Sequence, residues 1–328
     1  MASENASRSK KDFVFLYLKG IAMGAADVVP GVSGGTIAFI TGIYEELLET
    51  IKGFNLSVFK TLKQEGIAAT WKKVNATFLV VLFAGIFTSI ISLAKGITYL
   101  LDAYPVLLWA FFFGLIIASS LIIARYIKEW NAKTIGILIL GAAIAFYITI
   151  AAPSQIPDGL IYIFLSGCIA ICAMILPGIS GSFILLLMGA YATVLGSITG
   201  LVDGLKSADI QSITTYGTNI GVFILGCIVG IISFSNFLTW MFKKAYSMTM
   251  ALLTGFMIGS LNKVWPWKET TEFRINSHGL EVPFLQSNIS PFNFEEIAGQ
   301  PSQLWFAIGL CIAGFLLVFL MEKAAASK

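Results

Sequence analysis

Two copies of the pattern Pro-Gly-x-Ser-Gly are the residues of this sequence best suited to chemistry. One copy begins at Pro30 within VVPGVSGGT, and the other begins at Pro177 within ILPGISGSF. Proline ends the helix before it, and the glycines allow a sharp turn and the close approach of a ligand. We expect Ser33 to begin a helix that runs to Glu46, and Ser180 one that runs to Gly196. The free N–H groups and partial positive charge at such helix starts favour an anion.

Hydroxyl groups beside the two turns extend this predicted site, because serine and threonine can donate hydrogen bonds to an anion. An alternative stays open, in which the serines only cap their own helices. The residues predicted to bind the anion are Gly31, Ser33, Gly34, Gly35, Thr36, Gly178, Ser180, Gly181 and Ser182.

Charged and aromatic residues near the first turn suggest further roles. Asp27 lies in apolar sequence, where a carboxylate is a functional candidate; Met174 aligns with it in the second half, and this asymmetry suits a coupling or gating group. Asp27 could instead hydrogen-bond its own turn. Lys19 is a candidate partner of Asp27 or of a phosphate, or a lysine that reaches the membrane interface. Tyr44 and Tyr191 are predicted to line the cavity.

Composition places most of the chain in lipid. Of its 328 residues, 57% are hydrophobic and 12% are charged, and the mean hydropathy is +0.85. Soluble domains carry about 25% charged residues. The net charge of +3 gives no reason to expect a nucleic-acid partner, and the lone histidine, His278, cannot build a metal site, so we expect no metal and no cofactor. The cysteines all lie in apolar runs and are expected to be buried: Cys168, Cys172, Cys227 and Cys311.

Apolar runs of about 20 residues predict membrane-spanning helices. Two further regions, 13–50 and 160–200, are apolar but interrupted by the turns. Lys and Arg favour the cytoplasmic side, and their distribution is most uneven if both regions are re-entrant hairpins and both termini are cytoplasmic. The loop at 265–302 is then external, as a small lid or an unstructured cover. The six apolar runs are 77–101, 105–124, 134–152, 217–242, 247–264 and 303–322.

The two halves of the chain align as an internal repeat. The turns are 147 residues apart, and Gly42 and Gly189 keep the same spacing; Gly85 and Gly226 belong to a second block offset by 141 residues. After a cytoplasmic tail at 1–12, the units are 13–152 and 160–322, each with one hairpin and three spans. Three is odd, so the second unit enters the membrane from the opposite side. The prediction is an all-α integral membrane protein with an inverted-topology repeat, six transmembrane helices and two re-entrant helical hairpins.

The segments GAADVVPGVSGGTIAFITGIYEEL (24–47) and ILPGISGSFILLLMGAY (175–191) resemble the PopT family of bacterial undecaprenyl-phosphate translocases. The resemblance extends from about Lys11 to Lys323. It implies a lipid transporter in the bacterial cytoplasmic membrane that returns undecaprenyl phosphate to the inner leaflet for peptidoglycan and envelope synthesis, coupled to an ion gradient. A polyprenyl phosphate and membrane lipids are the implied partners, and homo-oligomerisation stays open. By motif position, one half-site would comprise Asp27, Pro30, Gly31, Ser33, Gly34, Gly35 and Thr36, and the other Pro177, Gly178, Ser180, Gly181 and Ser182.

Two other functions compete with lipid transport. Undecaprenyl-pyrophosphate phosphatases have a similar turn, but an arginine follows its serine, where this sequence has Gly34 and Gly181. Without a fixed cation in the turn, phosphoryl transfer lacks its usual stabilisation. A channel or exchanger for a small anion would use the same helix starts, and it remains the main alternative.

Overall fold

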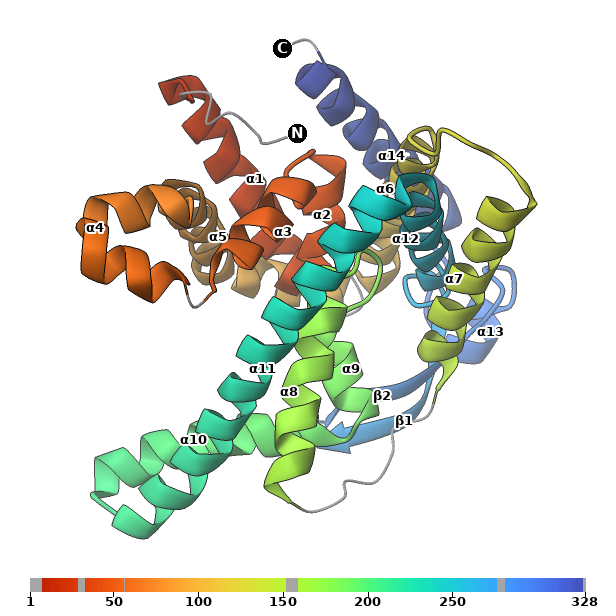
Figure 1. Ribbon diagram of the computed structural model, residues 1–328. Helices are drawn as coiled ribbons and strands as arrows, with labels where there is room; N and C mark the ends of the chain where they lie inside the picture. Colours follow the sequence, from red (N-terminus) through yellow and green to blue (C-terminus); the bar gives the residue numbers. More distant parts are fainter. Residues whose placement is uncertain (1–7, 29–32, 56, 152–158, 276–280, 327–328) are drawn as a thin grey trace.

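The structure is a computed structural model that describes residues 8–28, 33–55, 57–151, 159–275 and 281–326. It is helical apart from one pair of strands among these residues. The beginning of α1 and the end of α14 lie at one end of the molecule, and the two strands lie toward the other (Figure 1). The elements are α1 (Lys10–Val28), α2 (Gly34–Ile40), α3 (Tyr44–Gly53), α4 (Ser57–Lys73), α5 (Ala76–Ala103), α6 (Pro105–Ala124), α7 (Ala132–Ile150), α8 (Leu160–Ile175), α9 (Gly181–Leu187), α10 (Ala190–Ser207), α11 (Ile210–Lys244), α12 (Tyr246–Ser260), β1 (Lys268–Ile275), β2 (Glu281–Asn288), α13 (Phe294–Ala298) and α14 (Leu304–Ala326).

The six predicted apolar runs all form helices, namely α5, α6, α7, α11, α12 and α14. Within the described residues, α5, α6, α7 and α11 are long and apolar enough to cross a membrane, and α9 with α10 would add a fifth crossing if that bent pair is one span. The helix α12 has only 15 residues, and the apolar part of α14 runs from Leu304 to Leu320. The chain is therefore a multi-pass, mainly helical membrane protein.

Apolar side chains cover the outside of the molecule as well as its core. Ile91, Tyr147 and Trp305 are 79%, 70% and 81% exposed, whereas Phe78 and Met257 are fully buried. Exposed apolar surface of this extent is stable only against a partner or a membrane. The outer faces of α5, α7 and α14 are thus suited to contact lipid tails.

Two helix pairs in the two halves are held by equivalent close contacts. The helices α1 and α5 approach so closely that a Cβ at Gly85 would lie 2.2 Å from the carbonyl oxygen of Tyr17. In the second half, α8 and α11 do the same, and a Cβ at Gly226 would lie 2.1 Å from the carbonyl oxygen of Phe164. Small residues at such crossings allow membrane helices to pack backbone to backbone. These glycines are aligned by the repeat, as are Tyr17 and Phe164.

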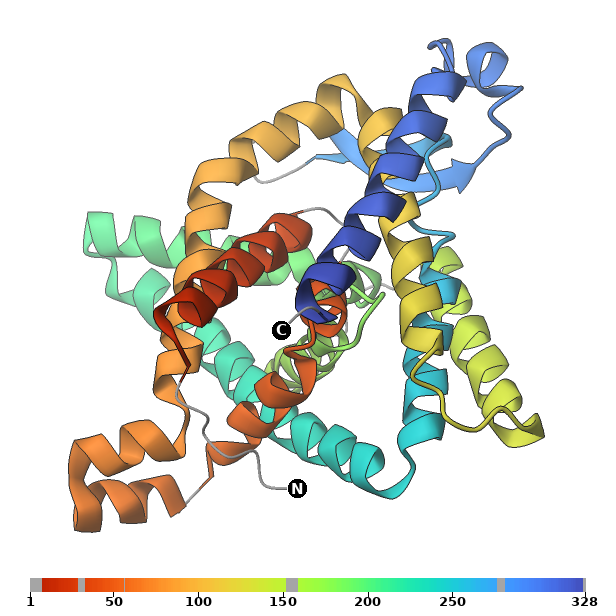
Figure 2. The ribbon, with the colours of Figure 1, turned by 90° about the horizontal axis from the view of Figure 1, so that it is seen from above.

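The remaining large helices pair across the two halves. The helix α6 packs against α14, where a Cβ at Gly114 would collide with the carbonyl oxygen of Cys311. The helix α12 packs against α7, where a Cβ at Gly255 would lie 2.2 Å from the carbonyl oxygen of Leu138. Gly114 and Gly255 are again aligned by the repeat. Seen from above, the long helices surround the short segments that follow the two turns (Figure 2).

The helices that follow the two turns are shorter than the sequence predicts. Both α2 and α9 contain seven residues and end near Gly42 and Gly189, whose φ angles are +72° and +73°. Glycine adopts this left-handed conformation without strain and ends a helix there. The predicted continuous helices to Glu46 and Gly196 are therefore wrong: α3 begins as a new helix at Tyr44, and α10 is bent by 106° from α9.

The loop at 265–302 is a structured cover in its described part. The strands β1 and β2 form an antiparallel hairpin, and α13 follows them. Trp267 and Phe294 are buried against Val106 and Ala110 of α6, which anchors this cover to the helices. These strands are the one departure from an all-α fold among the described residues, and the alternative of an unstructured loop is wrong for this part of the chain.

Candidate anion-binding site

The first turn places its polar groups at the start of α2. Ser33 is the N-cap residue and is only 1% exposed, and its hydroxyl oxygen accepts a hydrogen bond from the Gly35 N–H at 3.1 Å. The Gly34 N–H donates to Oδ1 of Asp27 at 2.7 Å. A carboxylate in this position is the interaction that a helix N-terminus favours. Asp27 therefore occupies the place where an external anion would bind.

The second turn has a different hydrogen-bond pattern. Gly178 has a φ of +84°, which only glycine adopts easily. Ser180 precedes α9 but makes no capping bond, and its hydroxyl lies 3.0 Å from that of Ser182. Gly181 packs closely on α8, since a Cβ there would lie 2.6 Å from the carbonyl oxygen of Ala170. The two hydroxyl groups of this turn are thus adjacent to the free N–H end of α9.

The two turns meet inside the molecule. The hydroxyl of Ser33 donates to the carbonyl oxygen of Met174 at 3.1 Å, and the Gly178 N–H donates to Oγ1 of Thr36 at 2.9 Å. A Cβ at Gly35 would lie 2.5 Å from the carbonyl oxygen of Ile175. Segments more than 140 residues apart therefore form one buried polar centre between α2 and the end of α8.

Several predicted ligands already have partners in this centre. The hydroxyl of Ser33 serves both its own helix and Met174, as the capping alternative anticipated, and the Gly34 N–H serves Asp27. Asp27 thus forms the hydrogen bond to its own turn that the sequence left open. A phosphate that uses these donors has to displace Asp27. Gly31, Pro30 and His278 lie outside the described residues.

Lys19, Tyr44 and Tyr191 are the remaining predicted site residues. The Lys19 ammonium donates to the carbonyl oxygen of Thr41, which ends α2. Tyr44 is 3% exposed and packs against Phe39, with ring centroids 4.8 Å apart; no described residue hydrogen-bonds its hydroxyl. Tyr44 therefore lies within the packed core, whereas Tyr191 is half-buried. Their roles as cavity-lining residues stay predictions.

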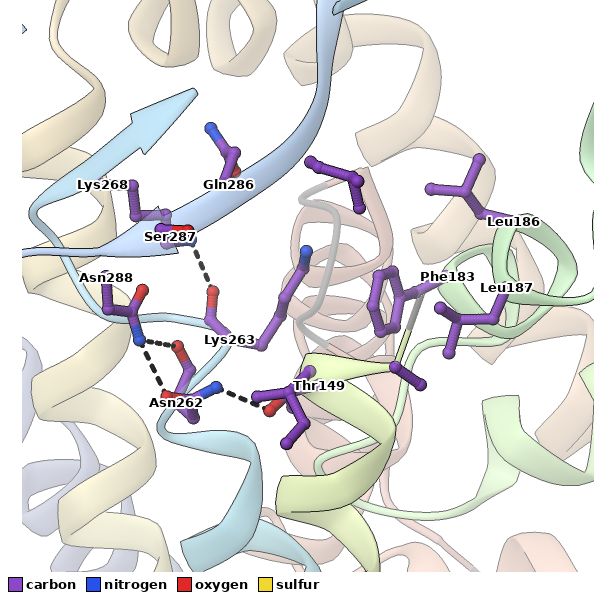
Figure 3. Close-up of a pocket in the computed structure, with 13 residues that line it drawn as sticks. Thr149, Phe183, Leu186, Leu187, Asn262, Lys263, Lys268, Gln286, Ser287 and Asn288 are labelled. Atoms are coloured by element: carbon purple, nitrogen blue, oxygen red, sulfur yellow. Dashed lines mark hydrogen bonds between the residues drawn. The ribbon is translucent and has the colours of Figure 1, made fainter. Parts of the chain in front are cut away.

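A cavity of about 270 Å³ opens beside α9 (Figure 3). We call it the lysine cavity, because Lys263 and Lys268 are the charged residues among its described lining. The Lys263 ammonium lies 4.2 Å from the centre of the Phe183 ring, and that of Lys268 lies 3.8 Å from the centre of the Trp109 ring. The sequence analysis included neither lysine among its predicted site residues. No motif in the sequence distinguishes these two lysines, and only the fold brings them together.

The family model described as undecaprenyl phosphate translocase-like matches residues 23–282. The chain belongs to this family. The match includes both turns, Lys263 and Lys268, so the polar centre and the two cations lie within the part of the chain that the family shares. The resemblance that the two turn segments indicated is therefore confirmed.

Two relatives have the same name. A polyprenyl-phosphate transporter of Vibrio cholerae serotype O1 is 48% identical over 314 residues, which are 96% of this chain and 97% of that protein. A polyprenyl-phosphate transporter of Staphylococcus aureus is 34% identical over 261 residues, which are 76% of this chain and 85% of that protein. No solved structure matches the chain.

Proposed function

We propose that this protein moves a polyprenyl phosphate, specifically undecaprenyl phosphate, between the leaflets of the bacterial cytoplasmic membrane. The observation that supports this most directly is the contact between the two turns, through Ser33 with Met174 and Thr36 with Gly178. The family to which the chain belongs and the names of its relatives point to the same substrate.

The physical problem of this transport is the phosphate head, because the isoprenoid tail need not leave hydrocarbon. Moving an isolated charge from water into an apolar medium costs tens of kcal/mol by simple solvation estimates. The hydroxyls of Ser180 and Ser182, and the backbone N–H of Gly34 once Asp27 has moved away, offer donors where irregular backbone is enclosed by helices. The head would pass from one turn to the other along this polar path.

The proposed architecture is an inverted repeat of the units 13–152 and 160–322, with both termini in the cytoplasm. The equivalent contacts at Gly85 and Gly226 support it, because the same helix pairs form in each half. In this arrangement one hairpin enters from each side, and small movements of the two units expose the centre to one leaflet at a time.

Asp27 is proposed to gate this path. Its carboxylate accepts from the Gly34 N–H and so resembles a bound phosphate oxygen in position and charge. The arriving head and Asp27 repel each other, and the head can bind α2 only after Asp27 moves away or takes up a proton. The second possibility would couple transport to a proton gradient.

The test is transport in proteoliposomes that contain a polyprenyl phosphate. A phosphatase added outside reaches only the outer leaflet, so transport appears as hydrolysis beyond the share initially present there. The variant Thr36→Val removes the acceptor of the Gly178 N–H, whereas Thr36→Ser keeps it. A buried unpaired donor costs about 1–3 kcal/mol, so we expect Thr36→Val to slow transport and Thr36→Ser to behave as wild type.

Two results would refute the proposal. The first is a wild-type protein that leaves the lipid distribution the same as in protein-free liposomes. The second is transport at the wild-type rate by both Thr36 variants. A chloride gradient across the same liposomes provides the comparison with an anion channel, since a lipid translocase leaves that gradient intact.

A further inference from the structure

The lysine cavity contains two lysine side chains that have no acidic partner among the described residues. The Lys268 ammonium donates to the carbonyl oxygen of Lys263, and each ammonium lies over an aromatic ring. The ion pairs in the described part of the chain involve other lysines and arginines. Buried cations are normally paired. Two lysines without an acidic partner around one cavity favour an anion, because a bound negative charge stabilises their protonated forms.

The lining of the cavity has one polar and one apolar part. Asn262, Ser287 and Asn288 lie with the lysines, and Asn262 is fixed by bonds to Thr149 and Asn288. Figure 3 shows these groups on one side and the side chains of α9 facing them on the other. That apolar side consists of Phe183, Leu186 and Leu187. Such a lining suits a molecule with an anionic head and a hydrocarbon tail.

The cavity also lies next to the second turn. Phe183 is part of α9, whose first residue, Gly181, follows Ser180 directly. The Phe183 ring in turn contacts the Lys263 ammonium. A head bound at Lys263 is therefore separated from the hydroxyls of Ser180 and Ser182 by the first turn of α9.

We propose that the lysine cavity is the loading site for the phosphate head of a lipid phosphate monoester, which binds Lys263 and Lys268 before it reaches the turns. This inference rests on the proposed function. The cavity volume of about 270 Å³ accommodates a phosphate group with several waters, since one water needs roughly 10–15 Å³ of such space. The tail lies against α9 and continues into the surrounding lipid.

Binding of the phosphate head at this site is coupled to protonation of the two lysines. Burial lowers the pKa of Lys263 to about 8, and burial together with the nearby Lys263 lowers the pKa of Lys268 well below its ordinary value. These lysines are the titratable groups among the described residues that line the cavity. A bound phosphate raises both pKa values, because opposite charges favour each other. The lysines therefore take up protons as the head binds, and the affinity for the head falls as the pH rises above about 8.

The test measures binding of farnesyl phosphate, a soluble short-chain analogue, to the purified full-length protein by calorimetry at pH 7. We expect Lys263→Met with Lys268→Met to weaken binding at least tenfold. The matched control is Lys206→Met, which removes an exposed lysine outside the cavity. Methionine keeps most of the length of the lysine side chain and removes the cost of burying a charge, so the double variant should melt no lower than wild type.

Two further measurements use the wild-type protein alone. Binding at pH 8 in two buffers of different ionisation enthalpy should show net proton uptake; the phosphate itself, with a second pKa near 6, supplies little. Neutral farnesol and inorganic phosphate serve as competitors, and both should bind at least tenfold more weakly than farnesyl phosphate. If inorganic phosphate binds equally well, the site takes free phosphate and the lipid assignment is wrong.

The outcomes separate this inference from the proposed function. Unchanged farnesyl phosphate affinity in the double variant, or binding without proton uptake, overturns the loading site even if the wild-type protein transports lipid. If the double variant binds farnesyl phosphate more weakly than wild type, but the wild-type protein does not transport lipid, the proposed function is overturned and an anion site remains. Lysine-dependent binding together with at least tenfold slower transport by the double variant supports both.

Discussion

The substitution Gly35→Ala tests the contact between the two turns with a single methyl group. In α2 the new Cβ would lie 2.5 Å from the carbonyl oxygen of Ile175 and 3.1 Å from that of Met174. Ordinary contact begins near 3.4 Å. The obstacle is backbone, not a flexible side chain, so α2 and the end of α8 have to separate.

The expected loss of transport rate follows from the free-energy cost of this overpacking, which is about 1–3 kcal/mol. If the strain exists only in the state in which the turns touch, the population of that state falls about 5- to 150-fold. Transport through the shared centre requires that state, so the rate should fall by the same factor. The intrinsic helix propensity of alanine, about 1 kcal/mol better than that of glycine, acts in the opposite direction.

The matched control is Gly221→Ala in α11. It makes the same chemical change within a helix, and no heavy atom lies within 4 Å of the new Cβ. The phosphatase-accessibility assay in proteoliposomes should show a wild-type rate for this control and a slow rate for Gly35→Ala. Equal rates for the two variants, at equal amounts of folded protein, would refute the reasoning that the turns must touch during transport.

Other substitutions test separate parts of the structure. Asp27→Leu should lower stability by about 1–3 kcal/mol, because it leaves the buried Gly34 N–H without an acceptor; a melting curve identical to wild type would contradict this. Asp27→Asn keeps an acceptor, so it should fold normally but transport with a weaker dependence on an imposed pH gradient; an unchanged dependence excludes Asp27 from coupling. Gly226→Val should lower the melting temperature, since its side chain would meet the carbonyl oxygen of Phe164; a stable variant would show that α8 and α11 do not pack this closely. Farnesyl phosphate affinity should decrease from pH 7 to pH 9 as Lys263 loses its proton, and a flat profile would exclude this lysine.

Much of the fold follows from local features of the sequence. Apolar runs predict helices because a span must satisfy its backbone internally, and all six runs form helices. The Pro-Gly-x-Ser-Gly pattern correctly predicts a helix start after each serine, at Gly34 and Gly181. The helix ends were missed because Gly42 and Gly189 adopt a left-handed backbone, which the apolar pattern around them did not indicate. The hairpin of β1 and β2 was missed because it is anchored through Trp267 to a distant helix.

The sequence by itself determined that most of the chain lies in lipid and that two similar turns interrupt it, and it predicted that the two halves are repeats. These properties depend on composition and spacing, which neighbouring residues determine. Only the tertiary structure decided that Ser33 bonds Met174, that Asp27 occupies the start of α2, and that Lys263 and Lys268 share one cavity. The physical reason is that each of these arrangements requires separate helices to pack in one particular way, and that packing depends on shape across the whole molecule.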